Sequence, residues 1–136
     1  MNYFLVKSDP DTYGWNEFVK EKKTSWTGVR NYAARLHLRT MKKGDQVLFY
    51  HSGGESSIVG LAKVVKEAYT DPTSGDPQWS AVDLEAGKKF PIPVSLTAIK
   101  KIPALKNMLL LKISRLSVMP VTEDEFSVIV AESNKK

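Results

Sequence analysis

Residues 26–50 read WTGVRNYAARLHLRTMKKGDQVLFY. The stretch begins with an aromatic ring at Trp26, just before a glycine, and continues with a cationic and amide pair at Arg30 and Asn31. A helical segment follows, and the strand-forming run 46–50 closes the stretch after a Gly-Asp turn. The order of ring, turn, helix and strand places several kinds of recognition chemistry close together, and the rest of the fold is inferred around it.

Positive charge is concentrated in this part of the chain. No Asp or Glu lies between Lys22 and Lys43, and the basic residues of that run are Lys22, Lys23, Arg30, Arg35, Arg39, Lys42 and Lys43. Unopposed positive charge next to aromatic rings and amides is typical of proteins that bind nucleic acid. A solvated helix face is the competing interpretation of the same charges.

A helix is expected to begin near Val29 or Arg30 and to end before the turn at 44–45. Apolar residues at i, i+4 and i+7 predict its buried face, formed by Val29, Ala33 and Leu36. A polar and basic stripe is expected on another side, formed by Asn31, Arg35, Arg39 and Lys42.

The composition is that of one ordinary domain: 136 residues, 42% hydrophobic, with a formal net charge of +5. The absence of Cys excludes disulfides, thiolate zinc sites and thiol nucleophiles. The apolar run at 3–6 is too short for a signal peptide, and no segment approaches the roughly 20 apolar residues of a membrane span. We therefore expect a cytoplasmic, monomeric protein with no membrane partner.

Along the remaining chain, short strands and helices alternate without a repeating period. Strands are predicted at 3–7, 46–50, 57–69, 79–84, 90–94 and 117–121, with a turn at 85–88. Helices are predicted at 15–22, 95–101 and 122–132, the last opened by the capping box at 122–125. Gly60 suggests a bulge or a close approach, and Pro91 and Pro93 place their segment at a sheet edge. An α+β fold is expected, with a mixed, mostly antiparallel sheet that curls into a barrel and helices packed around it.

Motifs of enzymes are scarce in this sequence. It has two histidines, His37 and His51, and it lacks the dinucleotide-binding, P-loop and nucleophile-elbow patterns. A spatial catalytic triad stays open because its members need not be neighbours in sequence. We expect no enzyme, no metal site and no cofactor.

Trp26 is the sharpest candidate for ligand binding, since a ring beside a Gly turn and an Arg-Asn pair is unusual for a purely structural Trp. Stacking of a base on such a ring contributes about 1–3 kcal/mol. A core position is the alternative. The other large rings are expected in the core: Phe4, Trp15, Phe18, Phe49 and Trp79.

The strand end Tyr50-His51-Ser52 supplies a ring and polar groups that suit the mouth of a cavity. Neutral His51 and Asn31 each offer a donor and an acceptor, as a base edge requires. Ser8 ends the first strand and is a weaker candidate, and Arg115 by itself suggests a surface charge.

Several motifs in this order resemble the EVE domain family, a PUA-like group that includes the thymocyte nuclear protein type. They are YFLVKSDPDTY at 3–13, WTGVRNYAAR at 26–35, MKKGD at 41–45, FYHS at 49–52, VG at 59–60 and SRLSV at 114–118. The resemblance covers almost the whole chain, and Asp9 departs from it by standing where the family more often has Glu.

The resemblance implies a single PUA-like pseudo-barrel over residues 1–136, with peripheral helices, similar to the YTH reader of methylated RNA. It implies a module that holds one modified base, for example a modified cytosine in DNA or a modified RNA base, in an aromatic pocket. The implied pocket residues are Ser8, Trp26, Asn31, Tyr50, His51, Ser52, Arg115, Leu116 and Ser117. Backbone phosphates would meet Arg30 and Arg35, with Arg39 and Lys42 of the basic stripe beside them.

Two other functions stay open on the sequence alone. One is an enzyme that acts on a nucleotide or nucleic acid with His51 as its base. The other is a protein-interaction domain that keeps a vestigial pocket.

Overall fold

The structure is a computed structural model that describes residues 1–53, 56–113 and 115–135. Its strands are β1 (Tyr3–Ser8), β2 (Lys23–Trp26), β3 (Gln46–His51), β4 (Ser57–Thr70), β5 (Ser80–Ser95) and β6 (Val118–Val121). Its helices are α1 (Trp15–Glu21), α2 (Tyr32–Thr40), α3 (Leu96–Lys101), the 3-10 turn η1 (Pro103–Leu105), α4 (Leu109–Lys112) and α5 (Glu123–Ser133).

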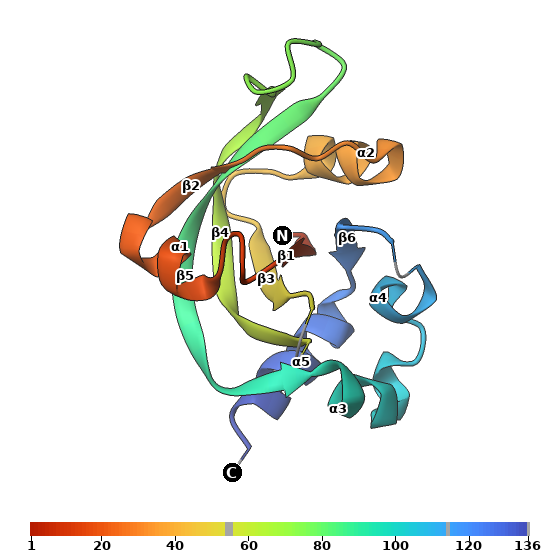
Figure 1. The fold of residues 1–136 in the computed structure, drawn as a ribbon. Helices are drawn as coiled ribbons and strands as arrows, with labels where there is room; N and C mark the ends of the chain where they lie inside the picture. The colour runs from red at the N-terminus through yellow and green to blue at the C-terminus, as the bar shows by residue number, and fades with distance from the viewer. Residues whose placement is uncertain (54–55, 114, 136) are drawn as a thin grey trace.

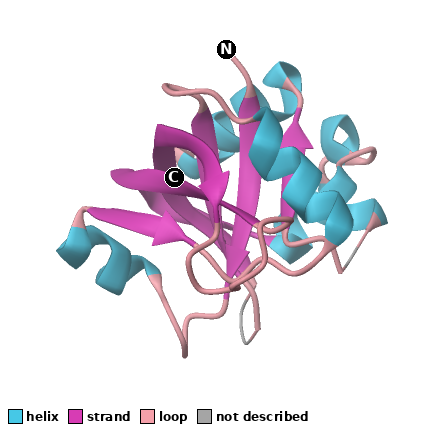
Figure 2. Cartoon of the chain, turned by 90° about the horizontal axis from the view of Figure 1, so that it is seen from above, coloured by secondary structure: helices cyan, strands magenta, loops and turns pink. Residues whose placement is uncertain are grey.

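The described strands form one six-stranded sheet in the order β2-β5-β4-β3-β1-β6. β1 pairs in parallel with β3, and the other neighbouring pairs are antiparallel. The sheet curls, but its end strands β2 and β6 do not pair in the described part of the chain, and helices lie around it (Figures 1 and 2). The predicted α+β class with a mixed, mostly antiparallel sheet and peripheral helices is confirmed.

The core is centred on β1 and β3, which are flanked by strands on both sides. Residues 47–50 of β3 are all buried, because the curl of the sheet and the surrounding helices cover both faces of this strand. Phe49 contacts three other aromatic rings. The Phe18 ring stacks on it with ring centres 5.2 Å apart, and the Trp15 and Trp26 rings pack edge-on against it at 5.4 and 5.7 Å. The predicted core positions of Trp15, Phe18 and Phe49, and of Phe4, are confirmed.

Gly60 is a close-approach glycine, as predicted. The register between β3 and β4 shifts beside it, and a Cβ atom at this position would lie 2.4 Å from the Trp15 ring. Real Cβ atoms do not approach a ring so closely, so a side chain here would have to displace Trp15 from the core.

The predicted turn at 85–88 is wrong, because β5 is one continuous strand. Glu85 pairs with Lys23 of β2 on one side and with Lys63 of β4 on the other. Ion pairs of 3.8 and 3.6 Å join the Glu85 carboxylate to these two amines. Pro91 and Pro93 lie beyond the end of β2, where β5 pairs with β4 alone, so they do occupy a local sheet edge.

Strand β2 was not predicted. Its four residues include three polar ones, and it pairs only with β5, so it lacks the apolar pattern of a central strand. Its pairing places Trp26 opposite Val82 and so fixes where the ring lies.

Helix α2 begins later than expected, and its predicted buried face is wrong. Asn31 has an extended backbone and caps the helix, with its side-chain Oδ1 accepting from the Ala34 N–H at 3.0 Å. Ala34 and Leu38 are the buried residues of the helix, while Leu36 is 53% exposed and Ala33 is also exposed. Val29 is buried as predicted, but it lies before the helix.

Within residues 1–53, 56–113 and 115–135, no helix is long and apolar enough to cross a membrane. The same residues contain no group of three or more His, Asp and Glu side chains placed to hold a metal ion.

Candidate functional site

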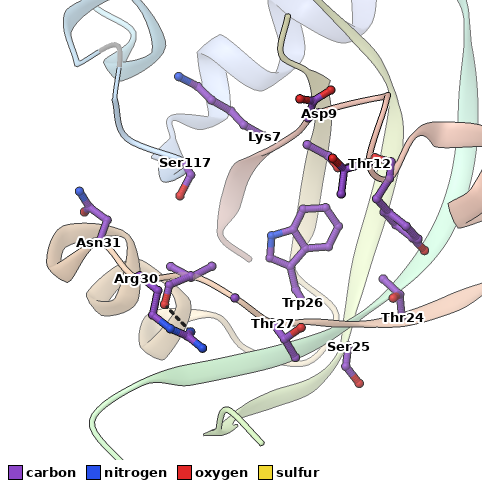
Figure 3. Close-up of a pocket in the computed structure, with 14 residues that line it drawn as sticks. Lys7, Asp9, Thr12, Thr24, Ser25, Trp26, Thr27, Arg30, Asn31 and Ser117 are labelled. Atoms are coloured by element: carbon purple, nitrogen blue, oxygen red, sulfur yellow. Dashed lines mark hydrogen bonds between the residues drawn. The ribbon is translucent and has the colours of Figure 1, made fainter. Parts of the chain in front are cut away.

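A cavity of about 700 Å³ opens between the end of β1 and the segment that joins β2 to α2 (Figure 3). Its volume lies in the usual range of small-molecule and base pockets. One wall is formed by Lys7, Ser8, Asp9, Thr12 and Tyr13, the opposite wall by the run 24–31, and Ser117 closes one side. Segments far apart in sequence therefore supply the lining.

Trp26 lies at the centre of the lining (Figure 3), between Asp9 and Thr12 on one side and Asn31 and Ser117 on the other. Its side chain is only 9% exposed, and its ring packs edge-on against Phe49. Trp26 is thus a core residue that also forms a wall of the cavity, and ligand binding by its ring stays a prediction.

Tyr13 supports the Trp26 ring from the β1 side. Its ring meets Trp26 edge-on at 6.3 Å, its carbonyl accepts from the Ser8 hydroxyl, and its own hydroxyl donates to Glu21. Burial and the hydrogen bond to Glu21 raise the pKa of Tyr13 to about 12, so the phenol stays neutral and remains a donor. The aromatic wall is therefore held by fixed polar contacts.

Asp71 anchors the opposite wall from outside the cavity. Its carboxylate is fully buried and accepts from the Gly28 N–H at 2.8 Å and from Arg30 Nη1 at 2.9 Å. The backbone N–H and the hydroxyl of Thr73 donate to its other oxygen, both at 2.7 Å. Burial alone would raise the pKa of Asp71, but these hydrogen bonds outweigh it and hold the pKa well below its usual range.

Gly28 is required at the turn between Trp26 and Arg30. Its φ of +81° lies in the left-handed region, which residues with a Cβ rarely adopt. The turn lets the Gly28 N–H reach Asp71 while Trp26 and Asn31 both line the cavity.

The polar lining provides both donors and acceptors. Asp9 offers a carboxylate, Asn31 an amide and Ser117 a hydroxyl. Lys7 adds an amine whose pKa is lowered by burial, and its Nζ lies 5.8 Å from the centre of the Tyr50 ring. Such a set can recognise a ring that carries both amino and carbonyl groups.

The structure brings four of the predicted pocket residues together. Ser8, Trp26, Asn31 and Ser117 line the cavity, and Arg30, predicted beside phosphates, lines it as well.

Other predicted pocket residues lie outside the lining. Tyr50 and Leu116 are buried in the core, and Arg115 is exposed. Ser52 lies behind the wall, where its N–H donates to the Ser8 carbonyl at 2.9 Å. Ser114 of the SRLSV motif falls outside the described residues. A direct ligand contact for these residues stays a prediction.

His51 lines a separate, smaller cavity of about 340 Å³, together with Trp15, Glu17 and Lys89. Its Nε2 accepts from the Trp15 N–H at 3.0 Å, which places the proton of the neutral ring on Nδ1. Burial lowers the pKa of His51 below 6.5, although Glu17 acts in the opposite direction. The imidazole therefore works as a neutral hydrogen-bond acceptor that holds the start of α1.

Protonation of His51 is expected to destabilise the fold. The pKa is lower in the folded state than the unfolded value of 6.5, so the stabilisation is complete above about pH 6.5 and falls as the pH drops toward the folded pKa. The loss cannot exceed about 1.4 kcal/mol per pH unit for one group. Urea unfolding from about pH 7 to about pH 5 should show a shallower pH dependence for His51→Gln than for the wild type.

His37 is the matched control, since burial lowers its pKa as well but the described residues give its ring no such acceptor role. His37→Gln should keep the part of the pH dependence that belongs to His51. Parallel curves for wild type and His51→Gln would contradict the assigned role of the Trp15–His51 hydrogen bond.

The predicted backbone-contact residues are mostly engaged with the protein. Arg35 Nη1 and Arg39 Nη2 both donate to the Gln78 carbonyl, at 3.0 and 2.7 Å. They tie α2 to the loop between β4 and β5, whereas Lys42 is exposed beyond the end of the helix. Phosphate contacts by Arg30, Arg35, Arg39 and Lys42 stay predictions.

The predicted core position of Trp79 is wrong. Trp79 is half-buried in the loop between β4 and β5, and its ring lies 5.2 Å from that of Tyr32. Tyr32, which is 61% exposed, is not among the predicted site residues. It belongs neither to the predicted apolar face of the helix nor to its basic stripe.

Lys7, Asp9, Thr12 and Tyr13 were also missed as cavity residues. Lys7 falls in the predicted strand at 3–7, and for the others only their position in the YFLVKSDPDTY motif points to a function.

The comparisons of this chain with known proteins all point to the same family. The family model described as EVE domain matches residues 2–132. Thymocyte nuclear protein 1 of Gallus gallus is 40% identical over an alignment of 137 positions. The aligned region covers 83% of this chain and 56% of the chicken protein. The chain thus spans little more than half of that relative's length.

Solved structures agree over nearly the whole chain. Protein Atu2648 of Agrobacterium tumefaciens has a TM-score of 0.95 at 42% identity, covering 98% of this chain and 94% of its own. Human THYN1, crystallised in complex with 5-methylcytosine-containing DNA, has a TM-score of 0.93 at 32% identity, covering 100% of this chain and 99% of its own. The YTH domain of Mmi1, with a TM-score of 0.61 at 15% identity, shares the fold alone.

Proposed function

The chain belongs to the EVE domain family, and from this premise we propose that it binds DNA and holds one modified cytosine in the Trp26 cavity. One observation carries the proposal: a cavity of about 700 Å³ with an aromatic wall and a polar lining, in a fold that matches human THYN1 bound to 5-methylcytosine-containing DNA. The match extends over the whole described chain, cavity walls included.

The chemistry of the lining fits a cytosine. Its exocyclic amine is a donor that Asp and Glu carboxylates accept, and Asp9 supplies a carboxylate in the lining. Asn31 and Ser117 offer donors for the ring carbonyl, and the Trp26 ring offers an aromatic surface. Removing a base from its stack costs a few kcal/mol in a duplex and less in a single strand, which stacking and hydrogen bonds offset.

The methyl group of 5-methylcytosine is expected to give a moderate preference over unmodified cytosine. Burial of one carbon contributes about 0.8 kcal/mol, which corresponds to about a fourfold difference in affinity. Specificity beyond this factor would require the cavity walls to stay rigid, a condition that the Asp71 and Tyr13 contacts favour.

We propose binding without chemical turnover, by one protein chain for each modified base. His51, the base of the enzyme alternative, lies in a different cavity from Trp26, and its Nε2 is occupied by the Trp15 N–H. A catalytic base has to reach the proton that it removes, and a ligand in the Trp26 cavity is separated from His51.

Titration with short single-stranded DNA tests the proposal. The strands carry one central cytosine or one 5-methylcytosine and are compared by calorimetry at about 50 and about 200 mM salt. We expect about a fourfold preference for the methylated strand at both salt concentrations, while the affinity for both strands falls with salt. An RNA strand of the same sequence serves as the third titrant, and mass spectrometry of the recovered strands checks for turnover.

Equal affinity for the two DNA strands, with a steep loss at higher salt, would leave only a basic surface and overturn the proposal. Tighter binding of the RNA strand would move the partner from DNA to RNA. Any change in the mass of a recovered strand would favour the enzyme alternative.

A further inference from the structure

A cluster of rings and guanidinium groups lies beside the cavity, at the start of α2. The rings of Tyr32 and Trp79 are 5.2 Å apart and inclined by 34°. The Arg35 guanidinium lies 4.8 Å from the Tyr32 ring centre and 5.4 Å from that of Trp79. Arg30 approaches the Trp79 ring at 5.7 Å. We refer to Tyr32, Trp79, Arg30 and Arg35 as the Tyr32 platform.

The platform is braced from the protein side. Arg35 Nη1 donates to the Gln78 carbonyl, and Arg30 Nη1 donates to buried Asp71. Arg35 Nε is buried, and no described residue accepts a hydrogen bond from it. The arginines therefore hold the rings in place and keep positive charge beside them.

Tyr32 is the exposed part of the platform. Its side chain is 61% exposed, the second largest value among the large exposed hydrophobic residues of the described chain. A single exposed apolar residue is common on protein surfaces, but this ring belongs to a cluster with a second ring and two guanidinium groups. The arrangement matches the stacking surfaces by which proteins bind single-stranded nucleic acid.

The platform is continuous with the cavity. Arg30 lines the cavity and also belongs to the platform, and Asn31, another lining residue, directly precedes Tyr32. Consecutive residues have Cα atoms about 3.8 Å apart, so the edge of the cavity and the platform are neighbours on the protein. A nucleotide next to the base in the cavity would therefore lie close to Tyr32.

The charges of the cluster suit a phosphate-linked partner. Three arginines meet here, Arg30, Arg35 and Arg39, against two acids, Asp71 and Asp76. The Asp71 carboxylate is fully buried behind Arg30, so it contributes little to the outer surface. The exposed face is therefore aromatic and positive, which complements a base with its phosphate.

We propose that the Tyr32 platform is a second subsite, which stacks the base adjacent to the modified cytosine in the same DNA strand. This inference rests on the proposed function and adds a contact outside the Trp26 cavity. The ligand of the subsite is any base, because stacking on a ring face does not depend on base identity.

A mutant cycle between protein and DNA tests the subsite. Tyr32→Ala is titrated with 5-methylcytosine strands that carry either a normal nucleotide or an abasic site next to the modified base, on the 5′ or on the 3′ side. Tyr32→Ala should weaken binding of the normal strand about tenfold. The variant and the wild type should bind one of the two abasic strands equally, since the stacking partner is then missing.

Two variants guard against a structural explanation. Tyr32→Phe keeps the ring and should bind like the wild type. Leu36→Ala removes another exposed apolar side chain of α2, outside the platform, and should also bind like the wild type.

The outcomes separate the two proposals. Normal affinity of Tyr32→Ala for the methylated strand, with the methyl preference intact, overturns the subsite alone. A tenfold loss that persists with both abasic strands also overturns it, because the effect would then not come from stacking of a neighbouring base. A wild type that binds methylated and unmethylated strands equally overturns the proposed function, and the subsite with it.

Discussion

Trp26→Ala is expected to weaken binding of the 5-methylcytosine strand by about 5-fold to 150-fold and to abolish the preference for the methyl group. Base–aromatic stacking contributes about 1–3 kcal/mol, and the Trp26 ring is the large apolar surface at the centre of the cavity lining. Calorimetric titration of wild type and variant with the methylated and unmethylated strands measures both effects.

Loss of Trp26 is also expected to destabilise the fold by about 3–5 kcal/mol, because the ring packs against Phe49 and Tyr13. Trp15→Ala is the matched control, since Trp15 packs on the same Phe49 ring but does not line the Trp26 cavity. The conservative pair Trp26→Phe and Trp15→Phe keeps both proteins folded if the alanine variants do not fold. Weaker methyl preference in Trp26→Phe than in Trp15→Phe is expected.

Unchanged binding by a folded Trp26 variant would contradict the account. Equal losses of affinity for Trp26→Phe and Trp15→Phe would do so too, because the effect would then follow from core packing and not from the cavity wall.

Asp71→Asn is expected to reduce the free energy of unfolding by about 1–3 kcal/mol, the usual cost of leaving buried hydrogen-bonding groups unpaired. The fully buried carboxylate accepts from Gly28, Arg30 and Thr73, and an amide cannot accept all of these hydrogen bonds. Arg30 is 40% exposed, so solvent screens its attraction to the carboxylate and the ion pair adds little to this loss. For a chain of this size the loss corresponds to a decrease in Tm of about 4–10 °C.

The pH dependence gives an independent test of Asp71. Its pKa is lower in the folded protein than in the unfolded chain, so its stabilisation is present above about pH 4 and is lost as the pH falls below that value. Asp71→Asn should therefore remove part of the acid sensitivity of the wild type, measured by thermal unfolding from neutral to acidic pH.

Asp76→Asn is the control on the same loop. Asp76 accepts from the backbone and side chain of its neighbour Gln78, and a small effect on stability is expected. If Asp71→Asn unfolds with the midpoint of Asp76→Asn, Asp71 does not anchor the segment between Gly28 and Arg30.

Local signals predicted most of the fold. The capping box at Thr122 does open α5, the Ser95 side chain does cap α3, and Gly60 does mark a close approach. Each of these positions is decided by interactions within a few residues or by one special backbone requirement, and such interactions are visible in a sequence.

Elements decided by tertiary pairing were not predicted. β2 exists because β5 pairs with it, and the turn expected at 85–88 is extended because Glu85 has a neighbour on both sides. The inward face of α2 is set by its packing against β4, β5 and β6, which the spacing of apolar residues within the helix does not reveal.

The candidate site could be predicted only in part, because some of its residues lie in one local motif while others come together only through the fold. Trp26, Asn31 and Arg30 stood out because they lie in one motif, Ser8 was a weaker candidate at the end of the first strand, and Ser117 came with the family resemblance. Asp9 and Tyr13 reach the cavity only because β1 ends beside it, and Tyr32 and Trp79 meet only because the loop between β4 and β5 folds back to α2 (Figure 1). Contacts between segments so far apart in sequence leave no local pattern.

The three tryptophans permit one direct measurement of the central claim, that a modified cytosine enters the Trp26 cavity. Trp26 lines the cavity, Trp79 belongs to the Tyr32 platform, and Trp15 lies in the core against Phe49 and outside the lining of the Trp26 cavity. Two-dimensional NMR resolves their indole N–H signals during titration with a strand whose 5-methylcytosine carries a ¹³C-labelled methyl group. We expect a saturable shift of the Trp26 signal, a nuclear Overhauser contact between the methyl group and the Trp26 ring, and an unperturbed Trp15 signal. A methyl group without contact to Trp26, with shifts confined to Trp79 and the arginines around it, would contradict the placement of the modified cytosine in this cavity.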